Sequence, residues 1–324
     1  MDFLILGDGY TAAERGKFEK DARRLVEILF SVSPFKERRS DFNVWGLCPP
    51  AEESGISRPR RGSHRRSRVG ATYDAFGSER YVLTFENRSL RDVAAFAPYE
   101  FIEILTNTRT YGGGGIFNLY STVAADSLWS PYVFVHEFGH HFAGLADEYY
   151  TSDVAYEAGR PERVEPWEPN ATALHDPTSL KWKDLVSPGT PIPTPWNKEA
   201  YETHARTIQE KRRKIRAENR PEEEMDALFT RAEEAGDDGC SRGREIRRQG
   251  RRVRGRDVRG EGLLPAADRL RDVLARRRAV LRRLPAGDRA RSSISTRAGR
   301  RRNPGELQAG AATCRVSRGA TWGA

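Results

Sequence analysis

The stretch VHEFGHHFAGLADEYY, residues 135–150, decides the fold of this chain, because it combines histidines and carboxylates at helical spacing. Its first half contains the pattern H-E-x-x-H at His136, Glu137 and His140. Residues four apart lie one turn apart on the same face of a helix, so both imidazoles can reach one ion. Glu137 lies beside them and can take a proton from a metal-bound water. The pattern therefore predicts an active-site helix that holds Zn²⁺ with one coordination position open.

The third ligand must come from beyond the helix. Asp147 follows His140 by seven residues, which on a continuous helix is a rise of about 10 Å and too far for a shared ion. Gly144 can end the helix, because glycine adopts the left-handed conformation at little cost. We therefore expect a helix to about Ala143, a turn at Gly144, and Asp147 as a metal ligand. Glu148 is the alternative, and either carboxylate could instead support a ligand histidine through a hydrogen bond.

The same stretch has readings that involve no metal. His141 lies about 140° around the helix from His136, so we expect it to pack rather than to bind the ion. A further alternative is that H-E-x-x-H occurs by chance on an ordinary amphipathic helix. The ring nitrogens of the histidines would then be hydrogen-bonded inside a core. The apolar lead-in YVFV, the helix break and the following Asp-Glu together favour the metal site. Bound zinc lowers the pKa of water to about 7 and polarises a carbonyl, the two requirements of peptide hydrolysis.

The chain around this stretch alternates strand-like and helix-like segments, which is typical of a layered α/β or α+β domain. Thr11 and Glu14 fit a capping box, and a helix is expected from there to about Phe30. The glycines at 112–115 have no following Lys-Ser/Thr for phosphate binding, so we expect a mobile rim or an edge strand beside a cleft. Asn170-Ala-Thr172 matches a glycosylation acceptor, a pattern too common to carry weight. The other expected strands are 3–10, 41–48, 80–86, 101–107 and the run within 111–126, and the other expected helices are about 198–219 and 221–234.

Composition excludes several classes of protein. None of the apolar runs in the 324 residues is long enough for a transmembrane helix, and no signal peptide is present. The three cysteines are too far apart for a disulfide framework or a zinc finger. Because the chain opens inside a strand-like segment, we expect that Met1 is not the natural start or that an upstream region is missing.

The motifs resemble those of the bacterial IgA-peptidase family of zinc metallo-endopeptidases. HEFGHHFAGLADEY, NTRTYGGGGIFNLYSTVAADS and LGDGYT carry the resemblance, which runs from about Phe3 to Glu234. It implies an α+β, metzincin-like catalytic domain with a mixed sheet and an active-site helix, zinc on His136 and His140, and Glu137 as the catalytic base. It also implies a protein or peptide substrate and a secreted or cell-envelope location. The usual metzincin glycine comes three residues after the second histidine, whereas Gly144 comes four after His140, which leaves the third ligand open.

The composition changes abruptly after Glu234. Residues 241–324 contain 24 Arg, no Lys and 7 acidic residues, a net charge of +17, which leaves −8 of the total +9 for residues 1–240. From residue 231 onward Phe, Tyr, Lys and His are absent, so this segment could hardly form a core. We therefore divide the chain into a catalytic domain, 1–235, and a disordered Arg-rich segment, 236–324. A frameshift near Ala235 explains the segment, because shifted codons of GC-rich DNA often encode arginine.

Three functions are compatible with these observations. The leading prediction is a zinc metalloendopeptidase with Glu137 as base and then proton donor. The alternative is a domain that keeps zinc but is inactive because its C-terminal part is lost. The third is nucleic-acid binding by the Arg-rich segment, which we expect to be non-specific. No membrane partner is expected, and the sequence does not define the oligomeric state or the substrate.

Overall fold

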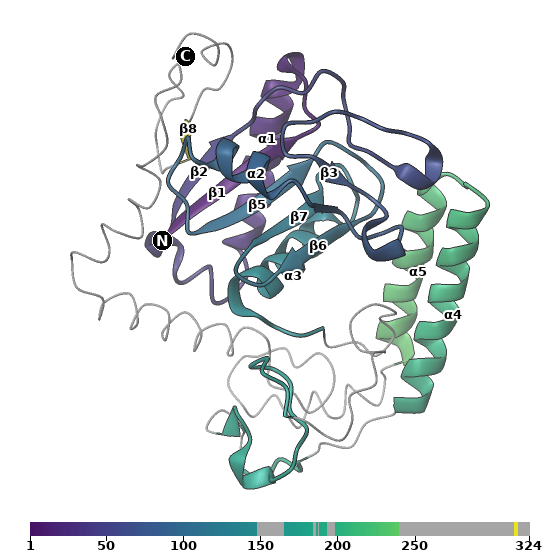
Figure 1. Ribbon diagram of the computed structural model, residues 1–324. Coiled ribbons are helices and arrows are strands. Elements are labelled where there is room, and N and C mark those ends of the chain that lie inside the picture. Colours follow the sequence, from purple (N-terminus) through teal and green to yellow (C-terminus); the bar gives the residue numbers. More distant parts are fainter. Residues whose placement is uncertain (148–164, 184–185, 187, 193–197, 240–313, 317–324) are drawn as a thin grey trace.

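The structure, a computed structural model, describes residues 1–147, 165–183, 186, 188–192, 198–239 and 314–316. Its centre is a six-stranded mixed sheet in the order β6-β7-β5-β1-β2-β8 (Figure 1). The four inner strands run parallel: β1 (Asp2–Asp8), β2 (Asn43–Leu47), β5 (Phe101–Thr106) and β7 (Tyr120–Ala124). The two edge strands, β6 (Gly113–Ile116) and β8 (Cys314–Val316), run antiparallel to their neighbours.

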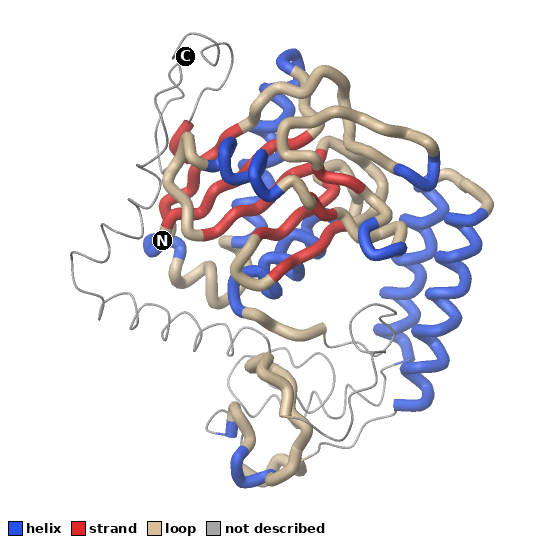
Figure 2. The backbone as a smooth tube through the Cα atoms, in the orientation of Figure 1, coloured by secondary structure: helices blue, strands red, loops and turns tan. Residues whose placement is uncertain are grey.

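Helices cover both faces of the sheet (Figure 2). α1 (Arg15–Leu29) and α3 (Ser130–Ala143) pack on one face, where Phe3 and Ile5 of β1 join the main core. The short α2 (Asn87–Ala94) packs on the other face against Leu4 and Leu6. Because β1 is buried on both faces, its sequence is a continuous apolar run rather than an alternating one. The mixed α/β architecture predicted from the sequence is therefore confirmed.

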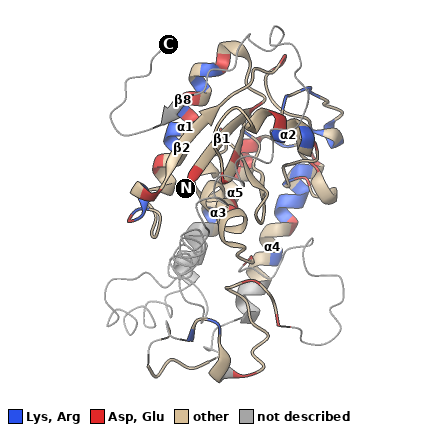
Figure 3. Cartoon of the chain, turned by 60° about the vertical axis from the view of Figure 1, so that its left-hand side comes forward, with Lys and Arg blue, Asp and Glu red and all other residues tan. Residues whose placement is uncertain are grey.

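A helical hairpin lies beside the sheet (Figure 1). It consists of α4 (Lys198–Ala217) and α5 (Glu222–Gly239). Phe229 of α5 contacts the rings of Tyr111 and Trp129, at centroid distances of 4.9 and 5.8 Å. Figure 3 shows that Lys and Arg are frequent on α4, whereas α5 begins with three glutamates, where the helix dipole favours negative charge. None of the described helices is long and apolar enough to cross a membrane.

Most of the expected elements before residue 150 are present. Thr11 and Glu14 form the expected capping box, and the helix that comes after it ends at Leu29. The expected strand at 80–86 is wrong in extent: only β4 (Leu83–Thr84) forms, paired with β3 (Ala71–Thr72), and α2 comes after it unpredicted. The glycines at 112–115 were expected to form a rim or an edge strand, and Gly113–Ile116 is the edge strand β6.

The prediction of disorder over 236–324 is wrong for two parts of that segment. α5 continues to Gly239, and Cys314–Val316 pairs with β2 as β8. Without β8, β2 would be the edge of the sheet, and a strand at an edge presents unpaired backbone groups that can bind a further strand whatever its side chains. The remainder, 240–313 and 317–324, lies outside the described residues.

Candidate metal centre

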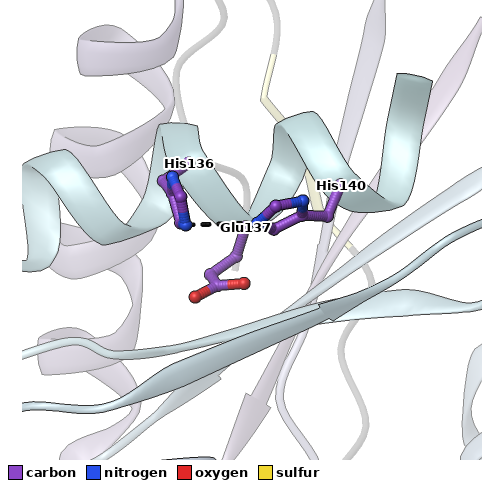
Figure 4. A group of neighbouring side chains, drawn as sticks. All are labelled: His136, Glu137 and His140. Carbon is purple, nitrogen blue, oxygen red and sulfur yellow. Dashed lines mark hydrogen bonds between the residues drawn. The ribbon is translucent and has the colours of Figure 1, made fainter. Parts of the chain in front are cut away.

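The helix that carries H-E-x-x-H is α3, and its two sides have different surroundings. Phe134, Phe138 and Phe142 are fully buried, and all three belong to the main core together with Phe3 of β1. His136, Glu137 and His140 instead line a cleft (Figure 4). The helix ends at Ala143, and Gly144 comes next with φ 64°, ψ 34° and its N–H donating to the carbonyl of His140 at 3.0 Å. The helix end and the glycine turn predicted from the sequence are therefore confirmed.

The two histidines present their Nε2 atoms to one point. The Nε2 atoms of His136 and His140 are 3.1 Å apart. Nδ1 of His140 contacts the carbonyl oxygen of Leu145, and since a carbonyl only accepts, this nitrogen carries the hydrogen. The neutral imidazole of His140 then has its lone pair on Nε2, the atom that faces His136. The ring of Tyr132 stacks on His136 at 5.4 Å between centroids.

Asp147 returns to the same point after the glycine turn. Its Oδ1 lies 3.1 Å from Nε2 of His136 and 3.1 Å from Nε2 of His140. Burial alone would raise the pKa of Asp147, but the two imidazoles hold it well below its usual range. Oδ1 is buried, and in the described part of the chain its polar contacts are these two imidazole nitrogens. The alternative ligand Glu148 lies outside the described residues.

The three converging atoms fit a cation of the size of zinc. Ligand atoms bound tetrahedrally at about 2.0–2.1 Å would lie roughly 3.3 Å apart, close to the three observed separations of 3.1 Å. Imidazole nitrogen and carboxylate oxygen are ligands that zinc accepts. Without a cation, lone pairs would face one another unless a proton intervened. Burial lowers the pKa of His140, but the carboxylates of Asp147 and Glu137 outweigh it and raise that pKa to about 9.

Glu137 lies next to this set. Its ligand oxygen and the ligand nitrogens of the two histidines are all within 4.8 Å of one another. Burial raises the pKa of Glu137, while the imidazoles of His136 and His140 act against the rise. A carboxyl group whose pKa is raised toward neutrality can both accept and return a proton.

His141 has a structural position, as the sequence predicted. It is only 1% exposed, and its Nε2 accepts a hydrogen bond from the N–H of Ile102 at 3.2 Å. Its Nδ1 lies 3.3 Å from the carbonyl oxygen of Ile116. The ring therefore links α3 to β5 and to the end of β6, and it points away from the three converging atoms.

The cleft above these residues has a volume of about 310 Å³, and β6 forms one of its walls. The glycines of β6 are required by close packing. A Cβ atom on Gly115 would overlap the carbonyl oxygen of Glu137, and one on Gly113 would lie 2.6 Å from Val133. Four aromatic side chains at the cleft are more than 40% exposed: Phe76, Phe117, Tyr132 and Trp167.

Sequence reasoning missed the segment that supports the glycine turn. Trp167 packs on Phe117 at 5.2 Å between ring centroids, and both rings lie against Gly144. The side chain of Asn170 forms two hydrogen bonds with the backbone of Ala146. Spacing along the sequence contains no signal for these contacts, because they join parts of the chain more than twenty residues apart.

The fold and the site define a mixed α/β protein with a His-Glu-His group on a helix beneath an antiparallel edge strand. The family model described as IgA Peptidase M64 matches residues 1–248, and the chain therefore belongs to this family of metallopeptidases, whose substrates are proteins or peptides. The match extends beyond Glu234, where the resemblance in the sequence ended. A search of the curated proteins found no match.

Proposed function

We propose that this chain is a zinc-dependent metalloendopeptidase. The observation that carries the proposal is the convergence of His136 Nε2, His140 Nε2 and Asp147 Oδ1 at 3.1 Å from one another. A buried carboxylate is costly unless a positive charge compensates it, and here that charge can be a proton on an imidazole or a metal ion shared with both histidines. His136, His140 and Asp147 would hold the zinc ion.

Each group has a distinct role in this proposal. When bound, zinc supplies Lewis acidity, which polarises a peptide carbonyl and lowers the pKa of water to about 7. Glu137 accepts the proton of the attacking water and then donates it to the leaving amine. Its burial favours this role, because a raised pKa brings the carboxyl closer to the working pH.

The edge strand β6 is the proposed binding site for the substrate backbone. It pairs with β7 on one side, and on the other side Gly113 exchanges backbone hydrogen bonds with Arg80 and Val82. A peptide that binds in an extended conformation could therefore add a strand beside the part of β6 that follows Gly113. The cleft beside it contains backbone and apolar groups as well as His136 and Glu137. By analogy with the family, we also propose that the protein acts outside the cell or in the cell envelope.

The test measures metal content and hydrolysis in the same preparations. Elemental mass spectrometry of the full chain should give about one zinc, and an unstructured protein such as casein should be cleaved. Glu137→Gln should keep the zinc and lose about 10²–10⁴-fold of the activity, the usual contribution of a general base. Asp147→Asn should lose zinc while it keeps the shape of the side chain.

The results also separate the alternatives. Zinc uptake without hydrolysis by the wild-type chain would support a binding domain that keeps its metal but has lost activity. A folded wild-type chain without zinc would contradict the proposal.

A further inference from the structure

Asn170 is a buried side chain that contacts the residue next to a candidate ligand. Its Oδ1 accepts a hydrogen bond from the N–H of Ala146 at 2.7 Å, and its Nδ2 donates to the carbonyl of Ala146 at 2.8 Å. The residue is only 3% exposed. The side chain thus pairs with Ala146 as a neighbouring strand would, through one donor and one acceptor. A buried amide engaged in this way is not accessible as a glycosylation acceptor.

The position of Ala146 determines where Asp147 lies. His136 and His140 are fixed by the regular hydrogen bonds of α3, but the helix ends at Ala143. Asp147 lies beyond the glycine turn and belongs to no helix or strand. The carbonyl of Leu145 is fixed by Nδ1 of His140, and the backbone of Ala146 is fixed by Asn170. These contacts leave the side chain of Asp147 directed toward the two Nε2 atoms.

The segment that carries Asn170 is itself held in place. Nζ of Lys181 donates to the carbonyls of Glu168 and Ala171, at 2.9 and 2.8 Å, and also to the carbonyl of Pro166. The ammonium group of Lys181 therefore binds three backbone carbonyls of the segment that contains Asn170. Trp167 adds a contact with Phe117 near the start of the turn. The hydrogen bonds of Lys181 thus hold the backbone on both sides of Asn170.

We infer that Asn170 is a positioning residue of the metal centre, which orients Asp147 by clamping the backbone of Ala146. The inference rests on the proposed function. A carboxamide offers a donor and an acceptor on one planar group, whereas an ionised aspartate only accepts and alanine does neither. The two hydrogen bonds of Asn170 fix the position of Asp147, as the hydrogen bonds of the helix fix the positions of the two histidines.

The test compares zinc affinities of the full-length chain by competition with a chromophoric chelator. Asn170→Ala should weaken zinc binding by roughly 10–100-fold, the usual effect of losing an outer partner of a ligand. Asn170→Asp keeps the acceptor oxygen and should fall between the wild type and Asn170→Ala. Thr172→Ala is the matched control, because it removes two hydrogen bonds of the same segment, with Glu165 and Leu174, but none with Ala146. It should leave the zinc affinity unchanged.

A second measurement needs no metal. In the metal-free protein, hydrogen exchange of the Ala146 amide should be faster in Asn170→Ala and unchanged in Thr172→Ala. If Asn170→Ala bound zinc as tightly as the wild type while His140→Ala did not bind it, the positioning role would be overturned and the proposed function would stand. An unchanged Ala146 exchange rate would also overturn the role. A folded wild-type chain that takes up no zinc would overturn both.

Discussion

Replacing Gly144 by alanine tests how the metal centre is built. Gly144 has φ 64°, a left-handed conformation that costs a residue with a Cβ atom roughly 1–2 kcal/mol. The new Cβ would also lie 2.8 Å from Cζ3 of Trp167 and 3.1 Å from Cδ2 of Phe117. Trp167 is 63% exposed and can move away, which sacrifices an aromatic pair worth about 0.5–1.5 kcal/mol. Together these effects predict a loss of about 1.5–3.5 kcal/mol in the free energy of unfolding.

The same helix provides a matched control. Gly139 lies inside α3, and of the described atoms a Cβ there would meet only Cδ1 of Leu145, at an ordinary distance of 3.5 Å. Alanine is preferred to glycine in a helix by about 0.8–1.0 kcal/mol, so Gly139→Ala should be neutral or stabilising. The two substitutions add the same methyl group five residues apart and should have opposite effects on stability.

Thermal unfolding and zinc titration together provide the measurement. For a folded region of this size, Gly144→Ala should lower Tm by roughly 5–10 °C, and its zinc affinity should fall because the turn that delivers Asp147 is displaced. Gly139→Ala should keep both properties. Equal stability and equal zinc affinity of the two variants would refute the reasoning that Gly144 is required by its backbone conformation and by the aromatic contacts.

Three further predictions concern other parts of the molecule. The pKa of His140 in the metal-free protein is about 9, so below that pH zinc must displace a proton from His140 in order to bind. The zinc affinity of the protein, measured by chelator competition, should therefore fall by about tenfold for each unit of decreasing pH. A zinc affinity that does not depend on pH would contradict this prediction. Because the pKa of His140 is higher in the folded protein than in an unfolded chain, protonation of His140 stabilises the metal-free fold. This stabilisation should be complete below about pH 6.5 and lost as the pH rises through about 9, which urea unfolding at several pH values would show. Phe229→Ala removes contacts with Tyr111 and Trp129 and should cost about 2 kcal/mol of stability, while the exposed Thr230→Ala should cost little; equal unfolding midpoints would show that α5 does not stabilise the cleft.

The parts of the fold that sequence analysis predicted are those with strong local signals. The continuous apolar run of β1 indicates a buried strand, and Thr11 with Glu14 marks the start of a helix through hydrogen bonds within four residues. Gly144 marks the end of α3 because few residues other than glycine adopt its conformation. We expected Asp147 to turn back toward the histidines if it is the third ligand, with Glu148 as the alternative, and in the structure Oδ1 of Asp147 lies 3.1 Å from Nε2 of His136.

The parts that were missed depend on contacts between distant segments. α2 has only eight residues, and its Leu90 and Ala94 are buried by strands that lie far away in the sequence. β8 pairs with β2, which would otherwise be the edge of the sheet, and no property of residues 314–316 reveals this pairing. Asn170 sits in a pattern that suggests surface exposure, whereas its burial depends on Ala146. Local patterns therefore indicated the candidate ligands His136, His140 and Asp147, but not the contacts that support Asp147.

The candidate ligands come from one uninterrupted piece of chain, residues 136–147, a helix and the turn that ends it. The loop that metal binding closes is therefore short, and its entropic cost is small. During synthesis, all of the candidate ligands would be translated before α4 and α5. If the gene does carry a frameshift near codon 235, the lesion leaves every donor encoded and alters only the codons downstream of it. Such a protein could then bind the metal even if it had lost the ability to hydrolyse peptides.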